Sequence, residues 1–308
     1  MNELKFQFIS KNAVNYFGKR VLAQIVFAKE LCIYNSLSED DLSKCVDYVY
    51  ESLISKGAIT AQICEKTEQM LGFYSHYAKK ITALMVAHAH IDMNWLWGYN
   101  ETVNITLSTC RTMLELMKEY KDFTFSQSQA SVYRIIEQFD PEMLDEIRER
   151  VKEGRWEVSS STWVENDKNM PNGESQVRQY TFAKEYLSRL FGLNKDYFCI
   201  DFEPDTFGHN ENLPEIMRKC GVKYYYHCRG DEAPMLYNWK SPSGNSVFVY
   251  REPNWYNWTI EHDVFSGLPR LSNEYKINKI LKVYGVGDHG GADMCRWYTL
   301  EWKWRFQT

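Results

Sequence analysis

Residues 81–97, ITALMVAHAHIDMNWLW, mark the point at which the sequence pattern of the chain changes. Before them, residues 1–80 have the pattern of helices, such as the segment 41–57, which ends at Gly57. From residue 81 a mostly apolar run leads to His88, as is typical of a buried strand. We therefore expect a helical N-terminal extension over residues 1–80 and an α/β domain that begins at residue 81.

Strand and helix patterns alternate after that first strand. Further strands are expected at 123–128, 156–161, 197–202, 222–228, 247–252 and 280–286. Helices are expected at 101–119, 130–153, 173–192 and 210–221. This alternation predicts a largely parallel sheet with helices on both faces. In such folds the functional side chains gather at the carboxyl ends of the strands.

Three polar residues follow the first strand at alternate positions. His88, His90 and Asp92 can share one face of an extended segment because successive side chains on a strand point to opposite sides. Imidazole nitrogen and carboxylate oxygen together suit zinc or a similar divalent metal. The alternative is a solvated strand end with satisfied histidines. An H-x-H at a first strand also begins amidohydrolase-type barrels, so the motif indicates a metal hydrolase without saying which one.

A second group of functional side chains lies in residues 197–229, YFCIDFEPDTFGHNENLPEIMRKCGVKYYYHCR. Asp205 comes just after a buried strand, where a nucleophile or a metal ligand is expected. Arg229 ends the next strand, so it should lie beside Asp205 and keep that carboxylate ionised or bind a substrate hydroxyl. The alternative is that Asp205 caps a turn and pairs with Arg229 for structural reasons.

The composition excludes some classes of partner. A net charge of −5 argues against a nucleic-acid surface, and no apolar stretch is long enough to span a membrane. The aromatic content of 15% agrees either with a sugar site or with a tyrosine-rich core. The eight cysteines form no C-x-x-C pair, and we expect them to be reduced in a cytoplasmic protein.

Several motifs in order resemble one known family. H-x-H-x-D-x-x-W at residues 88–95 is followed about 115 residues later by P-D-x-F-G-H at residues 204–209. Between them, residues 154–179 read GRWEVSSSTWVENDKNMPNGESQVRQ. Together these stretches resemble the catalytic N-terminal part of family 38 glycoside hydrolases, which are zinc-dependent retaining α-mannosidases. The resemblance implies a seven-stranded β/α barrel over residues 81–291 and mannose-containing oligosaccharides as substrates.

The resemblance also assigns roles to individual residues. It implies that one zinc ion is bound by His90, Asp92 and Asp205, and that Asp205 is also the catalytic nucleophile. In the family the zinc lies against the 2- and 3-hydroxyls of mannose. By the same resemblance, the residues that bind substrate are Trp95, Phe207 and Arg229. His88 matches the motif but is not a ligand in the family, so we expect it to have a supporting or structural role.

The general acid is expected in the sequence VYGVGDHGG, residues 283–291. Asp288 stands where the family has its acid, and His289 is the alternative. The implied mechanism is hydrolysis with retention, in which the two carboxyl groups lie roughly 5–5.5 Å apart. A third interpretation of this segment is a glycine-rich turn without catalytic function.

The chain also departs from the family pattern. The family's fourth zinc ligand is a histidine further along the sequence, and His289 is the last histidine here. Residues 292–308 have three tryptophans within eight residues and no regular period, so we expect a truncated or frame-shifted product with an anomalous tail. Weak zinc binding and little or no turnover would follow. The other hypotheses are an amidohydrolase-like metal hydrolase and an inactive sugar-binding remnant.

Overall fold

The computed structural model describes residues 1–230, 233–258 and 260–290. These residues form two compact units. One unit contains residues 1–84 and 260–281, and the other contains residues 85–258 and 282–290 of the described chain. All the candidate site residues lie in the second unit.

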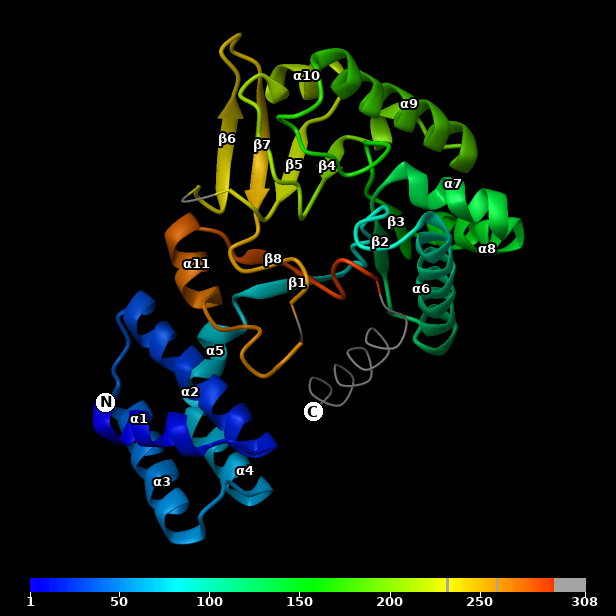
Figure 1. Ribbon diagram of the computed structural model, residues 1–308. Helices are drawn as coiled ribbons and strands as arrows, with labels where there is room; N and C mark the ends of the chain where they lie inside the picture. Colours follow the sequence, from blue (N-terminus) through cyan, green and yellow to red (C-terminus); the bar gives the residue numbers. More distant parts are fainter. Residues whose placement is uncertain (231–232, 259, 291–308) are drawn as a thin grey trace. The chain divides into compact units, whose positions relative to one another are not determined.

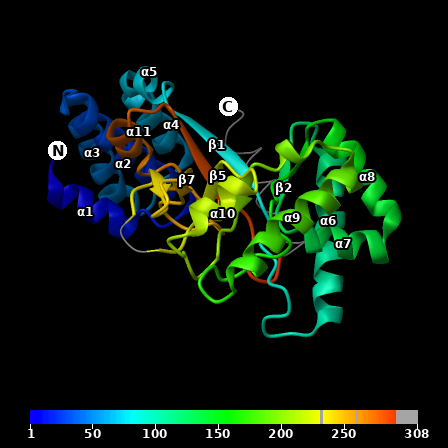
Figure 2. The same ribbon diagram turned by 90° about the horizontal axis from the view of Figure 1, so that it is seen from above.

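The first unit is a group of helices around one apolar core. Its helices are α1 (Glu3–Asn12), α2 (Tyr16–Asn35), α3 (Asp40–Lys56), α4 (Ala61–Met70), η1 (Leu71–Tyr74), α5 (Ser75–Ala78) and α11 (Leu268–Tyr275). Figures 1 and 2 show these helices gathered together in both views. Helices are therefore present where the sequence predicts them. Helix α11, which contacts α2, comes from a later part of the chain and was not predicted.

Strands β1 (Thr82–Ala87) and β8 (Lys279–Tyr284) are hydrogen-bonded to one another. The boundary between the two units falls within both strands. The sequence predicts both strands from their apolar residues, and the side chain of Val283 on β8 is buried. Residues that follow β1 and β8 carry the first half of the candidate site.

The second unit contains the other six strands. Strand β2 (Phe125–Gln127) pairs in parallel with β3 (Trp156–Val158). Strands β4 (Ile200–Phe202), β5 (Tyr224–His227) and β7 (Ser246–Arg251) also pair in parallel, and β6 (Leu236–Lys240) is antiparallel to β7. Figure 1 shows the order β6, β7, β5, β4 across this sheet. Most pairings are parallel, as predicted, whereas the antiparallel edge strand β6 was not predicted.

The sheets approach each other through isolated bridges. His88 bridges to Ser126 next to β2, and Trp258 bridges to Tyr284 at the end of β8. Within the described residues the strands remain three separate sheets and do not close into a barrel. The predicted α/β class with largely parallel strands is thus confirmed, whereas the closed seven-stranded barrel is not seen there.

Helices of the second unit are α6 (Tyr99–Glu119), α7 (Ala130–Phe139), α8 (Pro141–Lys152), α9 (Gly173–Phe191) and α10 (Leu213–Lys219), with a short 3₁₀ helix, η2 (Lys195–Tyr197). The single helix predicted over residues 130–153 is wrong, because the chain forms two. Pro141 lacks an N–H group and occupies the first turn of α8. Asp140 caps this new helix by accepting a hydrogen bond from the N–H of Met143 at 3.0 Å.

An apolar core joins helices α6, α7, α8 and α9 to strands β2 and β3. Trp156 on β3 is 1% exposed, and its indole Nε1 donates to the hydroxyl of Tyr133 on α7 at 3.1 Å. This packing fixes the strand ends from which the site loops emerge. Among the described residues, no helix is long and apolar enough to cross a membrane.

Candidate active site

Backbone hydrogen bonds continue beyond the ends of β1 and β8 into the segments that follow them. The N–H of His90 donates to the carbonyl oxygen of Val286 at 3.1 Å. Two residues later, the N–H of Asp92 donates to the carbonyl oxygen of Asp288 at 2.7 Å. The bond of His90 keeps the offset of a parallel pair, whereas Ile91 and His289, beyond it, form an antiparallel bridge. These contacts join two motifs that are nearly 200 residues apart in the sequence.

Glycines make this close approach possible. A Cβ atom at Gly285 would lie 1.9 Å from the carbonyl oxygen of His88, and Gly285 has a φ of +142°. A Cβ at Gly287 would lie 2.7 Å from the side chain of Asn257. Only glycine fits without displacing its neighbours. The glycine-rich segment is therefore a close-packed part of the site and not merely a flexible turn.

His90, Asp92 and Asp288 form a cluster of possible metal ligands. One ligand atom from each lies within 4.8 Å of the others. His90 is 2% exposed, and its Nε2 is 3.0 Å from Oδ1 of Asp92. Burial lowers the pKa of His90, but the carboxylates of Glu165 and Asp92 outweigh it and raise that pKa to about 10. One imidazole nitrogen with carboxylate oxygens is a donor set that suits zinc.

Asp205 and Arg229 meet at the ends of neighbouring strands, as the sequence predicts. Nε of Arg229 lies 2.8 Å from Oδ1 of Asp205, and Nη2 lies 2.7 Å from the same oxygen. Nε also donates to the backbone oxygen of Asp205 at 3.1 Å. Burial raises the pKa of Asp205, and the positive charges of His90 and Arg229 only partly offset this rise.

Asp205, the expected third ligand, is not in the cluster found among the described residues, whereas Asp288 is. The guanidinium of Arg229 holds one carboxylate oxygen of Asp205. The charge of His90 nevertheless lowers the pKa of Asp205, so the two groups are close enough to interact. The site thus has a cluster of ligands and an adjacent carboxylate–guanidinium pair.

Exposed aromatic rings accompany these charged groups. The side chain of Phe207 is 68% exposed, and the guanidinium carbon of Arg229 lies 4.1 Å from the centre of its ring. Trp95 is 60% exposed and lies edge-on to Trp97 at 6.2 Å. Accessible ring faces of this kind can stack on the apolar face of a sugar.

Glu165 joins the two parts of the site and was not predicted. Its Oε1 accepts a hydrogen bond from the backbone N–H of Asp205 at 2.5 Å. Its Oε2 lies 3.2 Å from Nδ1 of His90, which is within ion-pair distance but without the geometry of a good hydrogen bond. Glu165 lies in the irregular segment after β3, where no periodic pattern marks it. Glu165 does, however, lie within residues 154–179, one of the stretches that resemble the family.

Tyr256 is a second unpredicted residue of the site. Its hydroxyl donates to Oδ1 of Asp288 at 3.1 Å, and its ring lies 5.0 Å from the ring of His90. Burial raises the pKa of Tyr256, and the charges of Asp205 and Asp288 raise it further. The hydroxyl of Tyr256 is therefore close enough to both carboxylates to interact with their charges. Nothing in the aromatic run at residues 255–258 distinguishes it from its neighbours.

His289 and His88 point away from the ligand cluster. His289 Nε2 lies 2.8 Å from Oε1 of Glu101, and both side chains are about half exposed. His88 is buried, and its Nδ1 donates to the carbonyl oxygen of Ser126 at 2.9 Å. Burial lowers the pKa of His88 to about 3, so the ring is neutral. Neither histidine belongs to the ligand cluster among the described residues.

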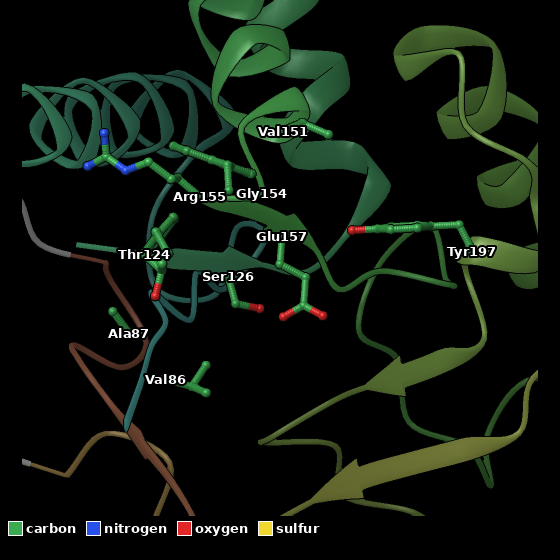
Figure 3. A pocket seen from close by; sticks show the side chains of 11 residues that line it. Val86, Ala87, Thr124, Ser126, Val151, Gly154, Arg155, Glu157 and Tyr197 are labelled. Carbon is green, nitrogen blue, oxygen red and sulfur yellow. The ribbon is translucent and has the colours of Figure 1, made fainter. Parts of the chain in front are cut away.

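A pocket elsewhere in the second unit is separate from this site. It has a volume of about 380 Å³ and is lined by residues of β1, β2 and β3 and by Tyr197. Figure 3 shows Ser126 and Glu157 close together on its wall. None of the predicted site residues lines this pocket.

Comparison with known proteins identifies relatives of the chain. The family described as "Glycosyl hydrolases family 38 N-terminal domain" matches residues 80–305. Alpha-mannosidase G of Dictyostelium discoideum is 31% identical over 71% of this chain and 21% of that protein. Alpha-mannosidase 2C1 of Homo sapiens is 30% identical over 67% of this chain and 20% of that protein. The chain thus spans about a fifth of the length of these relatives.

A solved structure supports the fold. The crystal structure of an alpha-mannosidase from Enterococcus faecalis V583 matches with a TM-score of 0.60 at 20% sequence identity. The match covers 72% of this chain and 27% of that protein. The family match continues to residue 305, and residues 291–308, which include the expected anomalous tail, lie outside the described residues.

Proposed function

Because the chain belongs to glycosyl hydrolase family 38, we propose that it carries the catalytic residues of a zinc-dependent retaining α-mannosidase. The substrates would be mannose-containing oligosaccharides with terminal α-mannosidic bonds. The observation that carries this proposal is the Asp205–Arg229 pair beside the cluster of His90, Asp92 and Asp288. In this proposal the pair supplies the nucleophile, and the cluster supplies metal ligands and the acid.

In this proposal zinc is held by His90, Asp92 and Asp205. The nitrogen and oxygen donors of this set fit that metal, and Nε2 of His90 lies on the side of the Asp92 carboxylate. When bound, zinc would orient and polarise hydroxyl groups of the sugar.

The two carboxyl groups would divide the chemistry in two steps. First, the carboxylate of Asp205 attacks the anomeric carbon, the glycosidic C–O bond breaks, and Asp288 gives its proton to the leaving oxygen. Second, water attacks the same carbon, gives a proton to Asp288, and releases Asp205. Retention of configuration follows from these two displacements. Arg229, Trp95 and Phe207 would hold the sugar in place during both steps.

The proposal also includes the barrel fold and the location of the protein. The parallel strands would belong to a seven-stranded β/α barrel, a proposal that the parallel pairings of β2 with β3, β4 with β5 and β5 with β7 support. A cytoplasmic location would suit the buried free thiols such as Cys45 and Cys110, whose pKa values burial raises to about 12.

Metal content and hydrolysis of an aryl α-mannoside test this function directly. The proposal predicts weak binding of one zinc ion per chain and a low turnover that Asp205→Asn reduces by at least about 10³-fold. Folded, zinc-loaded protein without turnover would instead identify a sugar-binding remnant. Hydrolysis of amides but not of mannosides would support the amidohydrolase-like alternative.

A further inference from the structure

Glu165 is held firmly within the second unit. Its side chain is 7% exposed. Its backbone N–H donates to Oε1 of Gln129 at 3.1 Å, and Nε2 of Gln129 donates to the carbonyl oxygen of Ile91 at 2.8 Å. Gln129 thus ties the Glu165 loop to the segment that carries His90 and Asp92. The side chain of Gln129 therefore links the backbone of Glu165 to the backbone of Ile91 and fixes the position of Glu165 relative to His90 and Asp92.

The two carboxylate oxygens of Glu165 face two different parts of the site. Oε1 accepts from the backbone N–H of Asp205, and Oε2 faces Nδ1 of His90 at 3.2 Å. Neither Oε2 nor that Nδ1 has another hydrogen-bond partner, although both are buried. A buried donor and a buried acceptor that face each other are expected to pair, because leaving both unsatisfied is costly.

The other ring nitrogen of His90 points to the ligand cluster, since Nε2 is 3.0 Å from Asp92. An imidazole can bind a metal through Nε2 only if that nitrogen carries no proton. An acceptor at Nδ1 keeps the proton on the far side of the ring, fixes the ring's orientation and makes Nε2 more basic. The carboxylate of Glu165 is placed where such an acceptor is needed.

We propose that Glu165 is a positioning residue that holds His90 in the Nδ1–H form for metal binding and fixes the backbone of Asp205. This inference rests on the proposed function, because it assigns Glu165 to the same zinc site. One carboxylate would then align a metal ligand and the nucleophile at once. A shift of the Glu165 loop would disturb both.

The zinc affinity of Glu165 variants tests this proposal without measuring turnover. Metal-free protein is titrated with zinc against a chromogenic chelator. We expect Glu165→Ala to weaken zinc binding by about 10–100-fold, the usual effect of losing a partner of a ligating histidine. Glu165→Gln keeps the shape and one acceptor oxygen but loses the charge, so a smaller loss is expected.

Thermal unfolding distinguishes positioning from a general structural role. Glu165→Gln should unfold close to the wild-type temperature when zinc is absent, but should gain less stability when zinc is added. A purely structural residue would lower the unfolding temperature of the metal-free protein and leave the zinc-induced rise unchanged. Glu137→Gln is the matched control, because that carboxylate bonds Arg134 and Tyr186 instead.

The proposal is overturned if Glu165→Gln and Glu165→Ala bind zinc as tightly as the wild type. If Glu165→Ala does not fold, the isosteric Glu165→Gln decides. Failure of the proposed function has a different signature, namely wild-type protein that is folded but neither binds zinc nor hydrolyses mannosides.

Discussion

Two nitrogens of Arg229, Nε and Nη2, contact the same carboxylate oxygen of Asp205, at 2.8 and 2.7 Å. The guanidinium therefore holds Oδ1 of the proposed nucleophile and does not occupy Oδ2. A third contact, from Nε to the backbone oxygen of Asp205, fixes the main chain as well. This fork geometry is a property of arginine that lysine cannot reproduce.

Replacing Arg229 by lysine should therefore impair catalysis even though the positive charge is kept. Hydrogen bonds to charged groups contribute about 1.5–3 kcal/mol, which corresponds to a fall in kcat/KM of roughly 10–100-fold. Steady-state kinetics on an aryl α-mannoside measures the effect. Arg178→Lys is the control, because Arg178 makes an exposed ion pair with Glu174. Full kcat/KM in Arg229→Lys would mean that only the charge at this position matters.

Asp288 stands in the ligand cluster, yet we propose it as the general acid, and its asparagine variant separates these two roles. Loss of a general acid typically costs 10²–10⁴-fold for a substrate whose leaving group needs a proton. We expect Asp288→Asn to lose that factor on a mannose disaccharide and much less on a dinitrophenyl mannoside. Zinc content, measured on the same samples, should stay at the wild-type level. A large loss of zinc in Asp288→Asn would make Asp288 a ligand instead.

The sequence predicts those parts of the site that a regular strand pattern positions. Asp205 and Arg229 follow consecutive parallel strands, so their contact follows from the fold class alone. The H-x-H-x-D spacing likewise places His90 and Asp92 on one face. By contrast, which loop crosses which strand end depends on tertiary packing. For that reason neither the contact of Glu165 with His90 nor that of Tyr256 with Asp288 could be predicted.

The same distinction applies to the fold. Strong apolar runs identified the parallel strands, because buried strands need continuous apolar sequence. Strand β6, with the sequence LYNWK, is only partly buried at the edge of its sheet and has no such run. The break between α7 and α8 depended on one proline within a pattern that is otherwise helical on both sides. An edge strand without an apolar run and a single proline are weak sequence signals compared with the regular alternation of strand and helix patterns.

Substituting alanine for Gly285 should disrupt the pairing that aligns His90 with Asp288. The added Cβ would lie 1.9 Å from the carbonyl oxygen of His88, a backbone atom that cannot rotate away. The φ of +142° adds strain for any residue with a side chain. We expect a loss of roughly 3 kcal/mol or more in the free energy of unfolding, measured by urea denaturation, together with weaker zinc binding.

Gly173→Ala is the matched control, since a Cβ there meets nothing within 4 Å. It should change the free energy of unfolding by less than about 1 kcal/mol. If Gly285→Ala were as stable as Gly173→Ala, the close approach of residues 88–92 to residues 284–288 would be incorrect.

Glu252 gives the second unit a predictable pH dependence. It is 1% exposed, it accepts a hydrogen bond from Tyr226 at 3.1 Å, and Lys282 lies 3.8 Å away. Burial raises the pKa of Glu252 from 4.5 to about 7, and Lys282 only partly opposes this rise. The folded state thus binds the proton of Glu252 more tightly than the unfolded state does.

The sign of the effect on stability follows from this difference. The contribution of protonated Glu252 is fully present below pH 4.5 and is lost as the pH rises through about 7. It amounts to about 3 kcal/mol for a shift of this size.

In Glu252→Gln this pH-dependent loss of stability should disappear, because glutamine cannot ionise but still accepts a hydrogen bond from Tyr226. Urea denaturation of both proteins between pH 4.5 and 8 measures the difference. Glu115→Gln, which changes an exposed glutamate of α6, should keep the wild-type slope. Parallel pH profiles for the wild type and Glu252→Gln would show that Glu252 ionises normally within the fold.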